Sequence, residues 1–231
     1  MKTFCFLGLA FFFVVFLVIT EISFALEPFT DNFQRADSAT VGNGWEEIED
    51  AGITASIVNG EVLIKGTETA DWVRDGIARN VNDINSISFD FLCNDQFNVH
   101  IRIDDTNALG YLEIYTWPGG VLNHANSVDG GWPGWVEIAG AQSVADKYNT
   151  LGINKVSANK FQVVLNDSAI GDVLENAGIN NINRIQLSSD SAVGTVGSLH
   201  IDSVVIDGGT TSAVKSFNKL STVWGAVKRS L

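Results

Sequence analysis

The sequence predicts an all-β protein built as a two-sheet antiparallel sandwich. Three observations lead to this class. Apolar and polar residues alternate through many short segments, turn-forming residues separate those segments at hairpin spacing, and no helical period occurs between residues 28 and 210. Because a single all-β domain often reaches roughly 200 residues, we expect one domain rather than several.

Residues 1–25 have the layout of a secretory signal peptide. Lys2 precedes an unbroken apolar run over residues 4–19, and Ser23-Phe24-Ala25 forms a small-x-small cleavage site. The alternative, an uncleaved membrane anchor, is disfavoured because the run is shorter than the ~20 residues that a spanning helix needs. We therefore expect a secreted or cell-surface protein.

Cleavage would leave Cys93 as the only cysteine, so no disulfide within the chain is expected. Cys93 ends the segment "SFDFLC", where a small buried apolar side chain fits the pattern of a strand end. Pairing between two molecules is the alternative.

The strands are expected in hairpin order along the chain. In "ASIVNGEVLIKG", Asn59-Gly60 lies between two apolar arms, which is the strongest short hairpin signal. The segments "GYLEIYTW", "NTLGINKV", "FQVVLND", "NRIQLSSD" and "LHIDSVVID" continue the alternation. Alternation in "SISFDFLCN" and "FNVHIRIDD" gives each strand one apolar face, made of Ile87, Phe89 and Phe91 in the first and Val99, Ile101 and Ile103 in the second.

One long irregular loop is expected between Trp117-Pro118 and Trp135. The segment over residues 115–135 is rich in glycine and proline and holds three of the six tryptophans, Trp117, Trp132 and Trp135. Loops of this length are usually functional or disordered. We expect the other tryptophans beside strands, Trp45 and Trp72, to serve packing.

Three segments together resemble a known family. "DNFQRADSATVGNGWEE", "YNTLGINKVSANKFQVVLNDSAIGDV" and "GSLHIDSVVID" resemble the opening, the central hairpin and the closing strand of secreted bacterial concanavalin A-like domains. The resemblance is to the laminin-G/lectin/glucanase superfamily and implies a jelly-roll sandwich over residues 26–207. The superfamily contains hydrolases, lyases, lectins and structural domains, so the resemblance leaves the activity open.

The residues typical of catalysis in that superfamily are not evident in the sequence. No strand carries the Glu-x-Asp-x-x-Glu pattern of the retaining glucanases, and no Arg/His/Tyr cluster of the kind found in lyases is apparent. His100 and His200 lie in alternating strands and are expected to have satisfied structural roles. His124 lies in the tryptophan-rich loop and is the one candidate catalytic histidine. One candidate histidine without a matching carboxylate pattern does not make a catalytic site, so catalysis is the less favoured interpretation and we expect no catalytic residues.

The tryptophan-rich loop is the candidate carbohydrate site. Rigid indole rings stack on the apolar C–H faces of sugars, and nearby polar groups direct hydrogen bonds to hydroxyl groups. The alternative is a small hydrophobic core beneath the loop. The predicted carbohydrate-binding residues are Trp117, Trp132, Trp135, Asn123, His124, Asn126 and Asp129.

The resemblance also implies a structural calcium ion, Ca2+, where the first and last strands lie side by side. Asp31, Asn32 and Asp202 are the expected ligands, because calcium takes several carboxylate and carbonyl oxygens. The alternative is that these aspartates cap turns or form ordinary surface charge.

The C-terminal segment differs in character from the rest of the chain. Residues 208–213 are expected to form a linker, and residues 214–231 carry apolar residues at helical spacing with a basic opposite face. This tail resembles short endings of assorted secreted bacterial proteins, which implies a sorting or attachment signal that contacts the cell envelope. Docking on the acidic body of the same chain is the alternative.

The sequence therefore favours a secreted carbohydrate-binding sandwich without catalysis, whose partner is a glycan or polysaccharide. A net charge of −13 makes nucleic acid an improbable partner, because phosphate backbones would be repelled. A glycoside hydrolase or polysaccharide lyase with an atypical site, and a structural or adhesive envelope protein, are the alternatives. The oligomeric state is left open.

Overall fold

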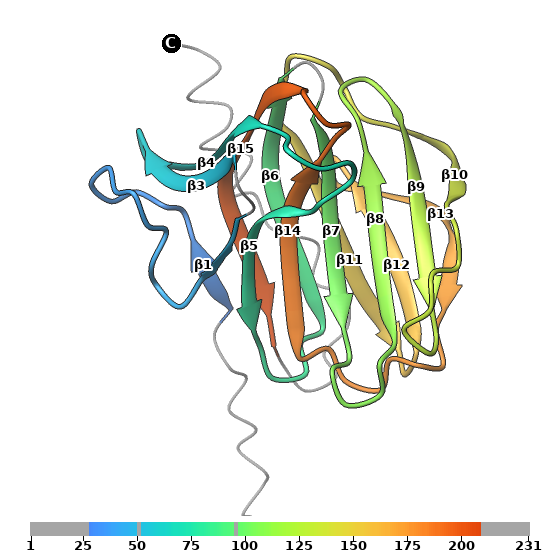
Figure 1. Cartoon of the computed structure of the whole chain (residues 1–231). Coiled ribbons are helices and arrows are strands. Elements are labelled where there is room, and N and C mark those ends of the chain that lie inside the picture. Colours follow the sequence, from blue (N-terminus) through green and yellow to red (C-terminus); the bar gives the residue numbers. More distant parts are fainter. Residues whose placement is uncertain (1–27, 50–51, 95–96, 209–231) are drawn as a thin grey trace, which may run out of the picture.

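A computed structural model describes residues 28–49, 52–94 and 97–208 of the chain (Figure 1). These residues form two antiparallel sheets packed face to face, so the predicted all-β sandwich is confirmed. Within these ranges no helix is long and apolar enough to cross a membrane. The predicted signal peptide, most of the predicted linker and the basic tail lie outside the described residues and stay predictions.

Sheet A holds the first and last strands of the sandwich. Its strand order is β13 (Ser168–Glu175), β12 (Lys160–Leu165), β11 (Asn149–Ser157), β6 (Ser86–Asn94), β15 (Val196–Asp207), β4 (Glu61–Thr67) and β3 (Ile53–Val58). The short strand β1 (Phe29–Asp31) also pairs with β15, with Phe29 opposite Ile206. The first and last strands therefore lie side by side, as the resemblance implies.

Sheet B lies in front in Figure 1 and carries the candidate site. Its strand order is β10 (Val136–Gln142), β9 (Val121–Ser127), β8 (Tyr111–Thr116), β7 (Asn98–Asp104), β14 (Arg184–Asp190), β5 (Asp75–Asn80) and β2 (Glu46–Ile48). Neighbours in the sheet come from distant parts of the chain, since β14 pairs with β7 on one side and β5 on the other.

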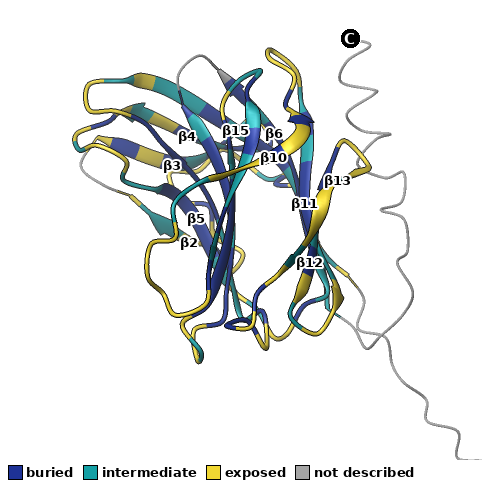
Figure 2. Cartoon of the chain, turned by 90° about the vertical axis from the view of Figure 1, so that its right-hand side faces the viewer, coloured by how far each residue is buried: buried dark blue, intermediate teal, exposed yellow. Residues whose placement is uncertain are grey.

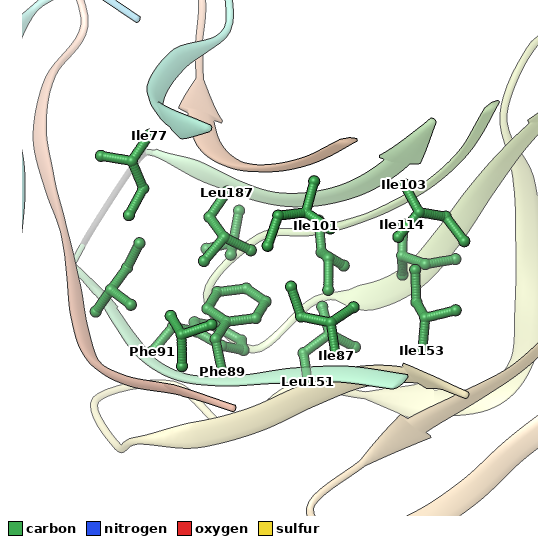
Figure 3. Packing of buried hydrophobic residues seen from close by; sticks show 14 of the residues in the cluster. Ile77, Ile87, Phe89, Phe91, Ile101, Ile103, Ile114, Leu151, Ile153 and Leu187 are labelled. Atoms are coloured by element: carbon green, nitrogen blue, oxygen red, sulfur yellow. The ribbon is translucent and has the colours of Figure 1, made fainter. Parts of the chain in front are cut away.

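The core fills the space between the sheets (Figure 3). Ile87, Phe89 and Phe91 of β6 face Ile101 and Ile103 of β7, as the alternation predicts. Figure 2 shows buried residues along the central strands and exposed residues along the edge strands β10 and β13. Cys93 is buried, as expected.

The predicted hairpin at Asn59-Gly60 is confirmed. Val58 pairs with Glu61 across the turn, and both central residues have positive φ, 53° for Asn59 and 76° for Gly60. Positive φ at both positions defines the turn that matches the twist of the flanking strands.

Two sequence predictions are wrong. The segment over residues 117–135 is not one irregular loop, because residues 121–127 form β9. Polar residues on both faces of β9 hide the alternation that marks the other strands. Trp72 is not a packing residue, since it lies in the β4–β5 loop with a φ of 60° and is 59% exposed. Trp45, by contrast, is buried as predicted.

Candidate functional site

The face of sheet B that points away from sheet A carries a dense set of polar and aromatic residues, and we call it the outer face. On β7 and β8 the apolar residues face the core, so their neighbours in sequence point outward. The pairing of β7 with β8 then sets these outward residues opposite one another: His100 with Tyr115, Arg102 with Glu113, and Asp104 with Tyr111.

His100 lies between two carboxylates at the centre of the outer face. Its Nδ1 atom is 2.8 Å from Glu113 Oε1, and its Nε2 atom is 3.0 Å from Asp190 Oδ1. Glu113 comes from β8 and Asp190 from the end of β14, so two neighbouring strands supply the partners. All three side chains are buried, with exposed fractions of 1% for His100, 0% for Glu113 and 3% for Asp190.

The three groups shift one another's pKa values. Burial alone would lower the pKa of His100, but the contacts with Asp190 and Glu113 outweigh burial and raise it. Burial alone would raise the pKa of Glu113, yet His100 and Arg74 hold it below its ordinary value. The pKa of Asp190 is also lowered, because the contacts with His100 and Asn98 outweigh burial. The arrangement therefore favours an imidazolium between two carboxylates.

Two arginines complete the charge balance around Glu113. Arg74, from the β4–β5 loop, donates through Nε to Glu113 Oε1. Arg102 donates through Nε to Asp104 Oδ1 at 2.7 Å, and its Nη1 atom is 4.0 Å from Glu113 Oε2. The Arg102 guanidinium also lies 3.9 Å from the centre of the Tyr111 ring, so the ring covers part of the charge.

Four aromatic rings form a continuous layer beside this charged cluster. We call Tyr115, Trp117, Trp132 and Trp135 the aromatic platform. Tyr115 lies 5.6 Å from Trp117 and 4.7 Å from Trp135, and Trp132 meets Trp135 edge-on at 5.1 Å, all between ring centres. His100 stacks on Tyr115 at 5.3 Å and contacts Trp135 at 5.9 Å. The platform therefore rests on the His100 ring.

The platform packs against His100 on one side and is exposed to solvent on the other. Trp117 is 38% exposed and Trp132 is 58% exposed, while Trp135 and Tyr115 are half-buried. The alternative of a closed small core beneath the loop therefore does not describe Trp132. These are the conditions for a ligand surface, because a rigid exposed ring loses little freedom when a ligand binds.

Glycine and hydroxyl groups hold the loop that carries Trp117. A Cβ atom on Gly120 would lie 2.1 Å from Trp117 Cε2, so only glycine lets the indole lie over the backbone there. Ser143 Oγ donates to the Trp117 carbonyl at 2.8 Å. On the other side, Tyr111 Oη donates at 3.3 Å to the carbonyl of Gly131, next to Trp132.

The structure brings only some of the predicted carbohydrate-binding residues together. Trp117, Trp132 and Trp135 meet in the platform, and Asn123 pairs with Tyr115 on the outer face. His124 and Asn126 point to the opposite side of the sheet, because they pair with the core residues Ile114 and Leu112.

Hydrogen bonds within the protein already engage two of these residues. Asn126 donates to the Glu175 carbonyl at 2.9 Å and accepts from Asn176 at 2.5 Å. Asp129 Oδ1 accepts from the Gly131 amide at 2.9 Å, which shapes the turn before Trp132. Burial lowers the pKa of His124.

The sequence analysis missed His100, Glu113, Asp190 and Arg74 as a group. The fold brings Arg74, His100 and Tyr115 together beside Glu113, a grouping that is not apparent in the sequence. Alternation in "FNVHIRIDD" and "GYLEIYTW" does place His100 and Glu113 on polar faces of consecutive strands. No sequence signal links Arg74 or Asp190 to them.

The predicted calcium ligands do not form an evident cation site. Asp31 is enclosed by N–H donors, namely the Phe33 amide, both Arg35 Nη atoms, Asn43 Nδ2 and Trp45 Nε1, at 2.8 to 3.3 Å. These donors outweigh burial and lower the pKa of Asp31, so its carboxylate oxygens already accept hydrogen bonds within the protein.

The other two predicted ligands, Asn32 and Asp202, do not form a coordination site with Asp31. Asn32 Oδ1 accepts from the Gln34 amide at 3.2 Å, and Asp202 is buried near a bulge of β15. In the part of the chain that the structure describes, no three His, Cys, Asp or Glu side chains are arranged to hold a metal ion. Calcium binding stays a prediction.

No protein-family model and no curated protein matches the chain. Among solved structures, a Crh5 transglycosylase has a TM-score of 0.62 at 9% identity, over 81% of this chain and 87% of its own. A Bacillus licheniformis beta-glucanase has a TM-score of 0.61 at 8% identity, over 78% and 97%. The carbohydrate recognition domain of Emp47p has a TM-score of 0.55 at 11% identity, over 79% and 95%. The chain therefore has the concanavalin A-like jelly-roll fold.

Proposed function

We propose that the protein binds carbohydrate through the aromatic platform and does not cleave it. The observation that carries the proposal is the exposed Trp132 ring, fixed edge-on against Trp135 in a layer that continues through Tyr115 to Trp117. Flat apolar rings of this kind match the C–H faces of pyranose sugars. The fold is shared with a carbohydrate recognition domain and with glucanases, which agrees with a sugar ligand.

The charged groups beneath the platform support binding rather than hydrolysis. A glycosidase needs two accessible carboxyl groups, one of them a general acid with a raised pKa. Glu113 and Asp190 are buried and paired with His100, and the pKa of each is lowered. Neither carboxylate is free to donate a proton to a leaving group.

Among the described residues of this face, His100, Tyr111 and Tyr115 offer no free base for elimination chemistry of the lyase type. Both ring nitrogens of His100 face carboxylate oxygens. Burial raises the pKa of Tyr111 and of Tyr115, so both phenols are held in the neutral form at neutral pH. A base must be available near the working pH to take a proton from the substrate.

A glycoside hydrolase is the second candidate, and one observation favours it. Burial raises the pKa of Asp104, although Arg102 opposes the shift, while the pKa of nearby Glu113 is lowered. Two carboxyl groups on one face with opposite shifts resemble an acid and its partner. Asp104 is nearly buried and donor-bound, which makes this the weaker candidate.

A binding panel combined with product analysis tests the proposal. The protein would be incubated with immobilised mixed-linkage β-glucan, xylan, mannan and N-acetylglucosamine oligomers. We expect retention on at least one glycan without new reducing ends or unsaturated sugars. Release of reducing ends that Asp104→Asn abolishes would establish the hydrolase instead. Failure to bind any glycan would favour the structural or adhesive role.

A further inference from the structure

The His100 ring contacts both the buried carboxylates and the platform. Carboxylate oxygens only accept hydrogen bonds, and each ring nitrogen lies within about 3 Å of one. Both nitrogens must therefore carry a proton for the two contacts to be favourable. The face of the same ring supports Tyr115, with an angle of 26° between the planes.

We infer that His100 is a positioning residue whose protonated ring holds Tyr115 and Trp135 in the platform, and that loss of one proton loosens the platform. When either nitrogen loses its proton, its lone pair lies within about 3 Å of a carboxylate oxygen and is repelled by it. The ring and that carboxylate must then separate, or water must enter between them. Because Tyr115 and Trp135 contact the ring, they move with it.

The other charged and titratable groups around His100 do not replace this proton. Arg74, from the β4–β5 loop, donates to Glu113. Arg102, on β7, donates to Asp104, and its Nη1 atom lies 4.0 Å from Glu113 Oε2. From β8 the titratable Tyr115 stacks on the ring. Asn98 donates to Asp190 Oδ1 at 2.8 Å and is neutral. Asp190 therefore depends on His100 for its nearest positive charge.

The direction of the pH effect follows from the balance already described. The two carboxylates outweigh burial and raise the pKa of His100 above its ordinary value. The platform therefore loosens as the pH rises through that raised pKa. The consequence for sugar binding rests on the proposed function, whereas the movement of Trp135 does not.

Nuclear magnetic resonance on the intact protein tests the inference. The imidazole resonances of His100 and the indole N–H resonance of Trp135 would be followed from about pH 5 to about pH 10. We expect the Trp135 resonance to shift with the same midpoint as the His100 imidazole resonances. The indole of Trp45, which donates to Asp31 at 3.0 Å, should not follow it.

Two histidine variants provide the matched comparison. His100→Gln should abolish the pH dependence of the Trp135 resonance, and His200→Gln, on the other sheet, should leave it unchanged. If His100→Gln does not fold, the wild-type titration alone decides. A Trp135 resonance that ignores the His100 titration, or a His100 ring that does not lose its proton below about pH 10, would overturn the inference.

A binding arm separates this inference from the proposed function. Mixed-linkage β-glucan oligosaccharide would be titrated at each pH. Sugar affinity that falls as the pH rises through the His100 midpoint supports both the positioning role and the proposed function. A Trp135 shift without sugar binding at any pH supports the positioning role and removes this glycan as the ligand.

Discussion

The outer faces of the two sheets carry similar residues in different settings. On sheet A, His200 Nδ1 lies 3.1 Å from Glu61 Oε2, and Tyr148 donates to the other oxygen of Glu61 at 2.7 Å. On sheet B, His100 meets two carboxylates and is covered by Tyr115 and Trp135. His200 remains half-exposed, whereas His100 is buried.

The difference comes from the loops rather than from the strands. Strand alternation places a histidine near a carboxylate on each face. Only sheet B receives Arg74 from the β4–β5 loop and the tryptophans from the turns around β9. Loops supply most of the residues that turn a scaffold face into a site.

Replacing each histidine by leucine should give the largest difference in stability between the two faces. His100→Leu leaves Glu113 and Asp190 buried without the imidazolium, which should lower the free energy of unfolding by about 3–5 kcal/mol. His200→Leu removes a partly exposed pair and should cost about 1 kcal/mol or less. Urea unfolding of both variants measures the two losses. Equal losses would mean that burial of the pair on sheet B has no energetic consequence.

Asp190 on sheet B and Asp90 on sheet A should contribute differently to stability as the pH changes. Burial alone would raise the pKa of Asp190, but the contacts with His100 and Asn98 outweigh burial and lower it. The stability that Asp190 contributes is therefore present above the pKa of the unfolded chain and is lost as pH falls through the folded value. Burial raises the pKa of Asp90 on sheet A, so its charge disfavours the fold at neutral pH.

We therefore expect Asp190→Asn to cost about 2–3 kcal/mol at neutral pH and to reduce the acid sensitivity of unfolding. Asp90→Asn should change stability by less than about 1 kcal/mol. The free energy of unfolding of both variants, measured in urea at several pH values, checks these two expectations. A larger loss for Asp90→Asn than for Asp190→Asn would reverse the assignment of the two faces.

A smaller effect is expected for Gly120→Ala, which tests how the loop builds the platform. The added Cβ would overlap the Trp117 ring, so the ring must move at a cost of about 1–2 kcal/mol. In a Trp117→Ala background the same change should cost far less, because the ring is gone. Thermal unfolding of the wild type, the two single variants and the double variant gives the coupling energy between positions 117 and 120. Additive losses would show that the ring does not rest on Gly120.

The sequence predicts the sandwich well because its signals are local. Asn59-Gly60 and the alternating segments of β6 and β7 each fix their structure within a few neighbours. The strand β9 was missed because polar residues occupy both of its faces. The cluster at Glu113 was missed because its partners are far along the chain: Arg74 is 39 residues away, and Asn98 and Asp190 are 92 apart. Only the strand register brings such residues together.

The most direct test of the central claim compares two tryptophans of equal exposure. Trp132 is 58% exposed within the platform, and Trp72 is 59% exposed on the β4–β5 loop, with no ring contact to the platform among the described residues. Titration calorimetry with the glycan retained in the panel would be run on Trp132→Ala and Trp72→Ala. We expect Trp132→Ala to weaken binding by about 1–3 kcal/mol with little loss of stability, and Trp72→Ala to bind like the wild type. Unchanged binding by Trp132→Ala together with a stability loss of about 3–5 kcal/mol would contradict the account, because the ring would then be packing rather than binding.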